Sequence, residues 1–525
     1  MASRLTTFSK FLITLAIVAA VFFLGRYFLQ NTEAGQELAK QAEIENVGGS
    51  NTNTSPSSSS GDDVIKIGVV TWGGYAGGQY FNKGFEVSNA SRFYQDYGLK
   101  VEFKVLDDFE ASRNAFKADE VNLLWATIDA FPTELGEKEG LTAFDPVVVF
   151  QADWSRGGDA IVARRGITKA SDLKGKKIAV AEMTPSHTFL IWLLEATGLT
   201  TDDIEIIPQA STIDAAEVFK SGKVDAAVVW SPDDILCVKA VPGSRILEST
   251  RSASYIIADI FMAKRSYVNA NTEKLRKLYE GWMIGAAEIN SDPSKRREAA
   301  KILSEEFTER GTALSVGDAD EMIGNVRLVT HGDNKNFFGL TNNYKGITGD
   351  ALYSRMSDKY SSLGYIKGSA PAWRSINYPG LVNSTTLANE EQFPEKVTYT
   401  KVTSKEADLP AVTNKEVSIN FRTGEFKLDE NAKYIIDREF VFEAKSSANR
   451  IRIEGNTDNV GSRSSNVSLS KKRAQAVADY LISEHGIPSN RVIVKGNGPD
   501  NPVASNNTDA GRAKNRRTDF KLLAN

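Results

Sequence analysis

The sequence predicts three structural parts: one N-terminal membrane-spanning helix, a two-lobed α/β body and a smaller α+β domain at the C-terminal end. Three observations support this prediction. An apolar run begins at Phe11, strand and helix patterns alternate from Val64 onward, and a strand, a turn and a helix follow one another between Ile451 and Leu481. At 525 residues the chain is also too long for a single hydrophobic core.

The apolar run near the N-terminus has the length of a membrane span. It covers residues 11–24 and resumes at 27–29 after Arg26, whose long side chain can reach the membrane interface. A helix of about nineteen residues, at ~1.5 Å per residue, spans about 28 Å, close to the hydrocarbon thickness of a bilayer. Arg4 and Lys10 precede the run, which places its start in the cytoplasm by the positive-inside rule.

Residues 1–30 are therefore expected to form an uncleaved anchor in the inner membrane, with the bulk of the chain in the periplasm. Cleavage as a signal peptide is the competing interpretation, but a cut after Ala20 would leave the apolar sequence VFFLGRYF at the new terminus. A lipoprotein is excluded because the first cysteine is Cys237. The span has no acidic residue, which argues against a proton-driven motor subunit.

A low-complexity segment follows the anchor. Its last part, at residues 48–63, reads GGSNTNTSPSSSSGDD and offers too little apolar surface to pack against a core. Residues 31–63 are therefore predicted to be a flexible linker.

Alternating strand and helix patterns define the body, at residues 64–381. The sequence VIKIGVV is predicted to be a strand, and the stretch from Asn114 to Pro132 a helix that leads to a short strand. Further β-rich runs and helices follow in the pattern of parallel sheets, and near Ile257 the chain returns. A chain that builds one lobe, crosses to a second and comes back forms a clamshell, with the second lobe at about 155–254.

Two long motifs mark this body: GITKASDLKGKKIAVAEMTPSHTFLIWLLEATGLTTDDIEII and DAAEVFKSGKVDAAVVWSPDD. They resemble periplasmic solute-binding proteins of the NMT1/THI5-like type, which serve nitrate, sulfonate, taurine and thiamine-precursor transporters. The resemblance is good over residues 64–267 and weak from there to 381. It implies the periplasmic-binding-protein fold, capture of a small-molecule solute between the lobes, and an ABC-type permease or a sensory protein as partner.

Five loops at the carboxyl ends of predicted strands are candidates for the solute site, because ligands of open α/β sheets bind there. Four of the seven tryptophans lie in these loops, and solute clefts favour rigid aromatic walls with a few polar groups. The candidate solute-binding residues are Trp72, Tyr75, Trp125, Thr127, Trp154, Ser155, Arg156, Ser186, His187, Trp230 and Asp233.

The polar candidates favour two opposite kinds of charge. Arg156 and His187 suit a carboxylate, sulfonate or phosphate, and Ser186 begins a predicted helix whose N–H groups would assist an anion. Three aspartates near tryptophans suit a cation: Asp153, Asp233 and Asp234. Because a zwitterion satisfies both sets, we expect a small anionic or zwitterionic solute.

Structural roles stay open for these residues, since a tryptophan can belong to the core, Asp233 can cap a helix and His187 can be a structural histidine. Catalysis is not expected, because the chain has no GxSxG motif and the thiamine-pyrimidine synthases among the similar proteins need a cysteine-rich iron motif. One cysteine, Cys237, and three histidines far apart in sequence predict no disulfide and no metal site. We therefore predict no enzymatic activity and no cofactor.

A polar segment at residues 382–414 is predicted to be a second connector, and residues 415–525 a separate α+β domain. In that domain the sequence IRIEGN alternates as a strand and is followed by a turn. Ser470 is the predicted N-cap of the next helix, because apolar residues follow it at helical spacing. Asp458 would then lie on the loop and Arg473 in the first helical turn, an arrangement that suits the ammonium and carboxylate groups of an amino acid.

Two motifs fill most of this domain: GNTDNVGSRSSNVSLSKKRAQAVADYL and GIPSNRVIVKGNGPDNPVASNNTDAGRAKNRR. They resemble the OmpA-like peptidoglycan-binding domain over residues 417–522. In that family the aspartate of the TD pair and the arginine of LSxxRA hold the diaminopimelate of the wall stem peptide, which implies these roles for Asp458 and Arg473. The candidate peptidoglycan-binding residues are therefore Asp458, Arg473, Thr457, Asn466 and Arg516. Asn466, Arg512, Asn515 and Arg516 match the family's motif and are interpreted mainly as loop-holding polar residues, and contact with the ligand stays open for Arg516.

The chain is nearly neutral, with 63 basic and 67 acidic residues and a formal net charge of −4, which argues against a nucleic-acid partner. Together these features predict an anchored binding protein of a Gram-negative envelope that captures a solute and grips peptidoglycan. The alternative is a structural or docking subunit of an envelope complex whose clamshell no longer binds solute.

Overall fold

The computed structural model describes residues 63–136, 140–400, 409, 411–417, 419, 421 and 425–523. The predicted anchor, and the predicted linker except for Asp63, lie outside the described residues. Within the described residues, no helix is both long enough and apolar enough to cross a membrane.

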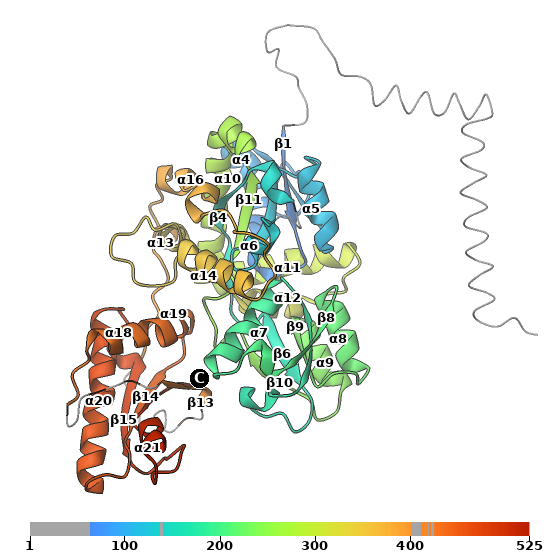
Figure 1. Ribbon diagram of the computed structural model, residues 1–525. Helices are drawn as coiled ribbons and strands as arrows, with labels where there is room; N and C mark the ends of the chain where they lie inside the picture. The colour runs from blue at the N-terminus through green and yellow to red at the C-terminus, as the bar shows by residue number, and fades with distance from the viewer. Residues whose placement is uncertain are drawn as a thin grey trace, which may run out of the picture. The chain divides into compact units, whose positions relative to one another are not determined.

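Two five-stranded sheets form the body of the protein (Figure 1). The first has the strand order β2-β1-β3-β11-β4 and the second the order β10-β6-β9-β7-β8. The strands are β1 Val64–Val69, β2 Lys100–Val105, β3 Leu123–Thr127, β4 Pro146–Gln151, β6 Asp159–Ala163, β7 Lys177–Ala181, β8 Glu205–Gln209, β9 Ala226–Trp230, β10 Arg245–Ser249 and β11 Asp259–Lys264.

Both sheets are mixed, whereas the sequence pattern indicates parallel sheets. In the first sheet β1 runs parallel to β2 and β3, but β11 runs antiparallel to β3 and β4. In the second sheet β7 runs parallel to β8 and β9, but β6 runs antiparallel to β9. The exceptions are strands at which the chain crosses between sheets: β6 enters the second sheet and β11 re-enters the first. This return makes the body two-lobed. A short ladder of β5 (Asp153–Ser155) and β12 (Val326–Leu328) lies at the first crossing.

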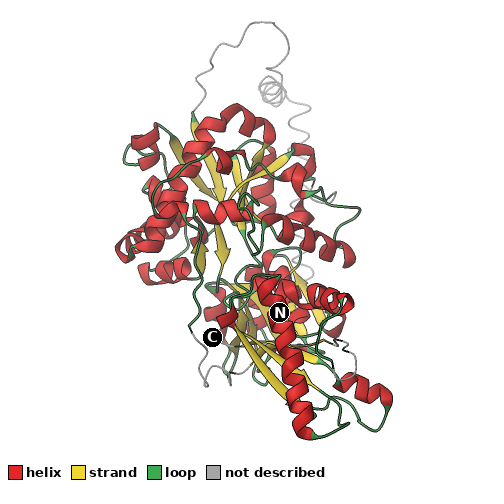
Figure 2. Ribbon diagram, turned by 90° about the vertical axis from the view of Figure 1, so that its left-hand side faces the viewer, coloured by secondary structure: helices red, strands yellow, loops and turns green. Residues whose placement is uncertain are grey.

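Helices flank the strands of both sheets (Figure 2). The α-helices of the body are α3 Ala76–Asn82, α4 Arg92–Tyr97, α5 Phe109–Lys117, α6 Phe131–Glu134, α7 Pro185–Ala196, α8 Thr212–Lys220, α9 Asp233–Ala240, α10 Arg265–Ser291, α11 Pro293–Glu309, α12 Val316–Gly324, α13 His331–Phe337, α14 Gly349–Ser362, α15 Trp373–Ile376 and α16 Gly380–Ser384. Short 3₁₀ turns are η1 Gly73–Tyr75, η2 Leu141–Phe144, η3 Ala170–Leu173, η4 Thr201–Asp203 and η5 Glu390–Gln392.

The sequence predicts one helix from Asn114 to Pro132, and this prediction is wrong. Helix α5 ends at Lys117, and β3 follows inside the first sheet, between β1 and β11. All five residues of β3 are buried, so its apolar run has no alternation with polar residues. A short apolar run of this kind cannot be assigned to helix or strand by periodicity alone, which explains the error.

The C-terminal domain is a four-stranded sheet with the order β13-β16-β14-β15. Its strands are β13 Ala411–Val417, β14 Ile451–Asn456, β15 Val492–Gly498 and β16 Thr518–Leu523, so β13 begins within the range assigned to the connector. Its helices are α18 Glu430–Ile436, the π-helical turn η6 Asp437–Val441, α19 Phe442–Ser446, α20 Arg463–Ser483, the 3₁₀ turn η7 Ser489–Arg491 and α21 Asp509–Asn515. Gly455 lets α20 lie close on β14, because a Cβ there would be 2.1 Å from the carbonyl oxygen of Ser470.

Helix α20 begins earlier than its sequence predicts. Its N-cap is Ser462, whose side chain accepts a hydrogen bond from the N–H of Ser465. Ser470 is buried within the helix, and its hydroxyl accepts the N–H of Gly498 at 3.0 Å. Arg473 therefore lies well inside the helix, and the argument from exposed N–H groups at a helix start does not apply to it. The polar run before Ser470 hides the first turns from an analysis of apolar spacing.

Candidate functional sites

A small cavity lies between the two lobes of the body. Its lining includes five of the residues predicted to bind solute: Trp72, Tyr75, Trp125, Thr127 and Trp230. The other lining residues are Val70, Thr71, Asp159, Pro185, Ile257 and Asp259. The space open to the centre of a water-sized sphere is about 20 Å³, which is room for about one water molecule. The lobes are thus nearly closed on each other.

Strand ends and the loops that follow them supply most of this lining. Trp72 and Tyr75 follow β1, Thr127 ends β3 and Trp230 ends β9. Phe109 stands between the two sides, because its ring is stacked on Trp230 with centroids 6.4 Å apart and meets the edge of Trp125 at 5.1 Å. The carboxyl ends of the strands therefore meet in one place, as expected for an open α/β sheet.

Four other predicted residues are buried around the cavity but do not line it. Trp154 lies on β5 and packs edge-on against Tyr255. The hydroxyls of Ser155 and Ser186 both donate to Asp159, at 2.9 and 3.5 Å. His187 accepts the N–H of Met183 through Nδ1, and burial lowers its pKa to about 4. This histidine is therefore neutral near pH 7 and adds no positive charge.

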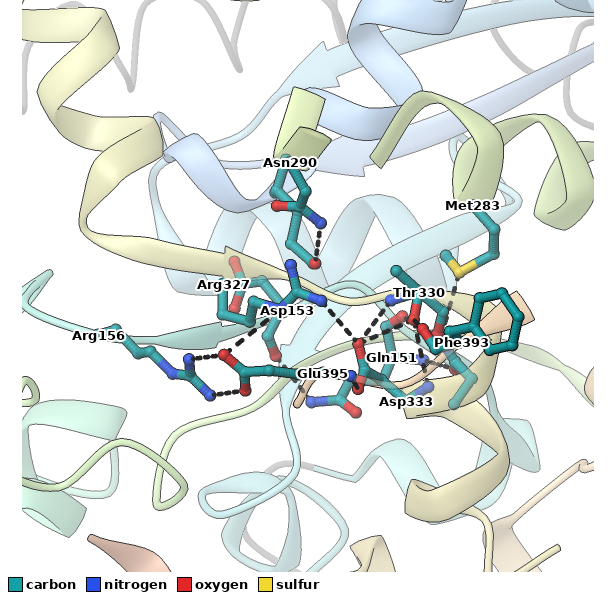
Figure 3. A network of polar contacts seen from close by, with 12 residues as sticks. Gln151, Asp153, Arg156, Met283, Asn290, Arg327, Thr330, Asp333, Phe393 and Glu395 are labelled. Carbon is teal, nitrogen blue, oxygen red and sulfur yellow. Dashed lines mark hydrogen bonds and ion pairs between the residues drawn. The ribbon is translucent and has the colours of Figure 1, made fainter. Parts of the chain in front are cut away.

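Arg156 and Asp233 also lie outside the cavity lining. Arg156 donates two hydrogen bonds of 2.6 Å to the carboxylate of Glu395, and the N–H of Glu395 donates to Asp333 (Figure 3). Arg156 thus binds the segment after the clamshell to the clamshell itself. Asp233 is the first residue of α9. The two groups that suited an anion, Arg156 and His187, therefore bring no charge to the cavity.

Four buried aspartates surround the same cavity, and sequence analysis singled out only one of them. Asp159 and Asp259 line it, and Asp153 accepts the indole N–H of Trp72 at 2.8 Å. The fourth, Asp129, lies two residues after β3. Burial raises the pKa of Asp129, Asp153 and Asp159 to about 7 each. The pKa of Asp259 is raised well above its ordinary value, mainly by burial and secondly by repulsion from Asp153.

A signal for these aspartates was present in the sequence. Asp159 and Asp259 are each the first residue of an apolar strand, and such a residue sits at the end of a sheet rather than in its middle. Residues that follow strands are the expected ligand contacts of an open α/β sheet, and because β6 and β11 run opposite to β9 and β3, their first residues lie at that same edge.

The second candidate site lies in the C-terminal domain, on the loop after β14. Asp458 is 9% exposed, and its Oδ2 accepts a hydrogen bond of 2.6 Å from Nη1 of Arg516, which follows α21. Asn466 and Thr457 hold the loop, since both donate to the backbone carbonyl of Asp458. Asn515, a further residue of the motif, accepts the N–H groups of two loop residues. Asn466 and Asn515 thus both bond to the backbone of loops in this domain.

Arg473 completes this site from α20. Its Nε donates to the carbonyl of Glu425, and its guanidinium lies 4.8 Å from the ring centroid of Phe421. The pKa of Arg473 is lowered, mainly by burial and secondly by repulsion from Arg516. Attraction to Asp458 acts in the opposite direction and raises this pKa. Asp458 and Arg473 are 9% and 7% exposed, whereas the side chain of Arg516, which contacts Asp458, is 47% exposed. Such a set can pair with both ends of a free amino acid.

Comparison with protein families assigns the two folded parts. Residues 83–296 match the NMT1/THI5-like family, and residues 420–516 match the OmpA family. The chain carries an NMT1/THI5-like domain followed by an OmpA-family domain. Most residues that line the cavity lie within the first match, and Asp458 lies within the second.

Curated relatives align with the OmpA-family domain. Outer membrane protein A of Bordetella avium is 35% identical over 127 residues, which is 23% of this chain and 64% of that protein. Outer membrane porin F of Pseudomonas aeruginosa is 33% identical over 145 residues, or 27% and 41%. Peptidoglycan-binding protein ArfA of Mycobacterium tuberculosis is 49% identical over 71 residues, or 14% and 22%. The chain therefore spans less than two thirds of the length of each of these relatives.

Solved structures align with the NMT1/THI5-like domain. The periplasmic aliphatic sulphonate binding protein SsuA of Escherichia coli has a TM-score of 0.47 and 16% identity, over 62% of this chain and 100% of that chain. The periplasmic nitrate-binding protein NrtA of Synechocystis has a TM-score of 0.46 and 14% identity, over 61% and 87%.

Proposed function

We propose that this chain is a binding protein of the cell envelope that captures a small solute in its NMT1/THI5-like domain and grips peptidoglycan with its OmpA-family domain. The second half rests on the ion pair between Asp458 and Arg516, with Arg473, on the helix α20 that follows the loop, as the third member of the proposed site. The carboxylate can accept the ammonium group of a diaminopimelate residue, and the guanidinium groups can pair with its carboxylate. The relative named as a peptidoglycan-binding protein adds support.

Arg516 has a defined part in this proposal. In the unliganded protein it neutralises Asp458, and its side chain is 47% exposed. An incoming ammonium group replaces that contact at Asp458, and Arg516 turns to the carboxylate of the same ligand. The exchange keeps every charge paired, so the desolvation cost of a buried unpaired ion is avoided.

The cavity between the lobes supports solute capture. Its aromatic lining and few polar groups have the composition of a small-molecule site, and closure of two lobes is a common way to enclose a ligand. An N-terminal span at residues 1–30 would hold the receptor in the inner membrane with both domains in the periplasm, near an ABC-type permease. Alkaline extraction and N-terminal sequencing test that span, and a new terminus near residue 20 would contradict it.

Sedimentation of the whole chain with isolated peptidoglycan sacculi tests the wall-binding role. Asp458→Ala and Arg473→Ala should each abolish co-sedimentation while circular dichroism stays unchanged. Asp479→Ala, which alters an exposed aspartate on the same helix as Arg473, is the matched control and should sediment like the wild type. Retention of both site variants on sacculi would refute the proposal.

One observation favours a second function, that of a docking subunit whose clamshell no longer binds solute. The cavity holds only about one water molecule, so the lobes must open before any solute enters. A calorimetric titration that finds no ligand would favour this role.

A further inference from the structure

The charged side chains that line the cavity are carboxylates. The four aspartates at positions 129, 153, 159 and 259 are each at most 5% exposed. In the part of the chain that the structure describes, none of the four is within 4.0 Å of a lysine, arginine or histidine nitrogen. Burial of several carboxylates without a counter-charge is costly, and such groups either take up protons or bind a cation.

The nearby basic groups are already engaged. Arg113 lies 4.7 Å from the ring centroid of Trp125, but its Nε and Nη2 both donate to the carboxylate of Glu134 at 2.7 Å. Helix α7 begins in the cavity lining at Pro185, which has no N–H to offer an anion, and α3 begins directly after the lining residue Tyr75. The next residue on α7, Ser186, already donates its hydroxyl to Asp159. An anion would therefore meet carboxylates at this cavity and no unpaired positive charge among the described side chains.

Several polar atoms at the cavity lack a partner. Thr127 and Trp125 line the cavity and are each 2% exposed, yet Oγ1 of Thr127 and Nε1 of Trp125 make no hydrogen bond with any described residue. Oδ1 of Asp153 likewise has none, although its Oδ2 accepts the indole N–H of Trp72. Unsatisfied buried polar atoms are rare in folded proteins, and a ligand is a common explanation.

From this arrangement we propose that the cavity recognises the ammonium group of a small organic cation and rejects sulfonates and nitrate. The proposal rests on the proposed solute-binding function and specifies its ligand. The carboxylates of Asp153, Asp159 and Asp259 receive the ammonium group, and the faces of the tryptophans surround it by cation–π contact. The unpaired Thr127 hydroxyl and Trp125 N–H take an oxygen atom of the same molecule.

An organic cation fits this site better than a metal ion. The described residues contain no group of three or more His, Cys, Asp or Glu side chains placed to hold one metal ion. The cavity walls are instead largely aromatic, with Trp72, Tyr75, Trp125 and Trp230 among the lining residues. Aromatic walls with carboxylates behind them are suited to a diffuse organic charge.

Entry of the ligand requires the lobes to separate. The indole ring of Trp72 packs on Gly158, where a Cβ would come within 1.9 Å of the ring. The indole N–H of Trp72 donates a hydrogen bond to Oδ2 of Asp153. The Trp72 N–H therefore holds a position that a ligand N–H can take. When the ligand enters, Trp72 exchanges this hydrogen bond for a contact between its ring face and the cation.

The experiment is a calorimetric titration of the whole chain with four probes at equal ionic strength. Ethanolamine and choline carry an ammonium group and a hydroxyl, whereas ethanesulfonate and nitrate are anions. We expect binding of at least one ammonium probe and no heat from the anions. Asp159→Asn and Asp259→Asn should each weaken that binding by about 30-fold or more, because one partner of a buried charge pair is lost. Asp96→Asn, which changes a half-exposed aspartate elsewhere, should leave it unchanged.

The outcomes separate this inference from the function on which it rests. Binding of ethanesulfonate or nitrate, without binding of the amines, overturns the inference and leaves solute capture intact. Absence of heat from all four probes, together with Asn variants that melt like the wild type, overturns both. Equal binding of an amine by the wild type and by both Asn variants overturns the inference as well, since the ligand would then lie elsewhere.

Discussion

Asp159→Asn is expected to stabilise the unliganded protein at neutral and alkaline pH. Burial raises the pKa of Asp159 from 3.8 to about 7, so between these pH values the folded protein keeps a proton that the unfolded chain has released. The stability linked to this group is therefore complete below pH 3.8 and is lost as the pH rises through about 7. At 1.36 kcal/mol per pKa unit, this loss amounts to about 4 kcal/mol.

Asparagine has the same shape and no charge, and it can still accept the hydroxyl of Ser155. The groups that act on Asp159 are Ser155, Ser186 and Asp234, and its charge in turn raises the pKa of its three aspartate neighbours in the cavity. These neighbours ionise more easily once Asp159 is neutral, which adds to the gain, whereas water penetration and relaxation around a buried charge reduce the penalty that the substitution removes. We expect between about 1 and 4 kcal/mol at about pH 8, and almost none at about pH 4.

Thermal unfolding of the whole chain at these two pH values measures the effect. A stabilisation of 1 kcal/mol raises the melting temperature by about 2–4 °C for a domain of about 150–250 residues. The transition of the clamshell must be followed on its own, since a chain with two domains does not unfold in one step. Asp96→Asn is the control and should not move the transition. A variant that melts below the wild type at about pH 8 would refute the account of strained, unpaired carboxylates.

Three further predictions concern the scaffold around the two sites. Arg113→Ala should destabilise the clamshell by about 3–5 kcal/mol in urea unfolding, because it leaves the carboxylate of Glu134 buried and unpaired. The double variant with Glu134→Ala should lose less than the two single changes added together, and simple additivity would contradict the pair. Arg156→Met should leave the affinity for ligand, measured by calorimetry, unchanged, because Arg156 pairs with Glu395 and does not line the cavity. A tenfold loss of affinity, equivalent to about 1.4 kcal/mol, would show that Arg156 contacts the ligand. Gly455→Ala should lower the stability of the OmpA-family domain and its retention on sacculi, because the new Cβ would be 2.1 Å from a backbone oxygen of α20. Amide hydrogen exchange should become faster in β14 and α20, and faster exchange only in other elements would contradict this prediction.

The two-lobed body could be predicted because its strand and helix segments alternate, and the C-terminal domain because its two motifs resemble those of a known family. Strand and helix segments alternate over the body, and the return near Ile257 precedes β11, which re-enters the first sheet. The direction of β6 and β11 could not be predicted, because it depends on how the chain crosses between lobes. The start of α20 was misplaced for a local reason: its first turns carry polar side chains and leave no apolar spacing to detect.

Candidate residues were predictable where chemistry is local in sequence. Thr457, Asp458, Asn466 and Arg473 belong to one continuous motif, and the structure pairs Asp458 with Arg516, which also matches the family motif. The cleft was harder, because its lining residues come from six separate segments of the chain. Trp72, Trp125 and Trp230 were found by their position after strands, whereas Arg156 was assigned to the cleft without knowledge of Glu395, a partner 239 residues away.

The charge pairing at Asp458 can be tested most directly with soluble wall peptides. Calorimetry of the whole chain should compare two muropeptides that differ only at the third residue of the stem, one with meso-diaminopimelate and one with lysine. Lysine offers an ammonium group but no second carboxylate, so Asp458 keeps a partner while Arg473 and Arg516 lose theirs. The account predicts clear binding of the diaminopimelate peptide and at least about a tenfold weaker affinity for the lysine peptide, a difference of about 1.4 kcal/mol. Equal affinity for both peptides would contradict it.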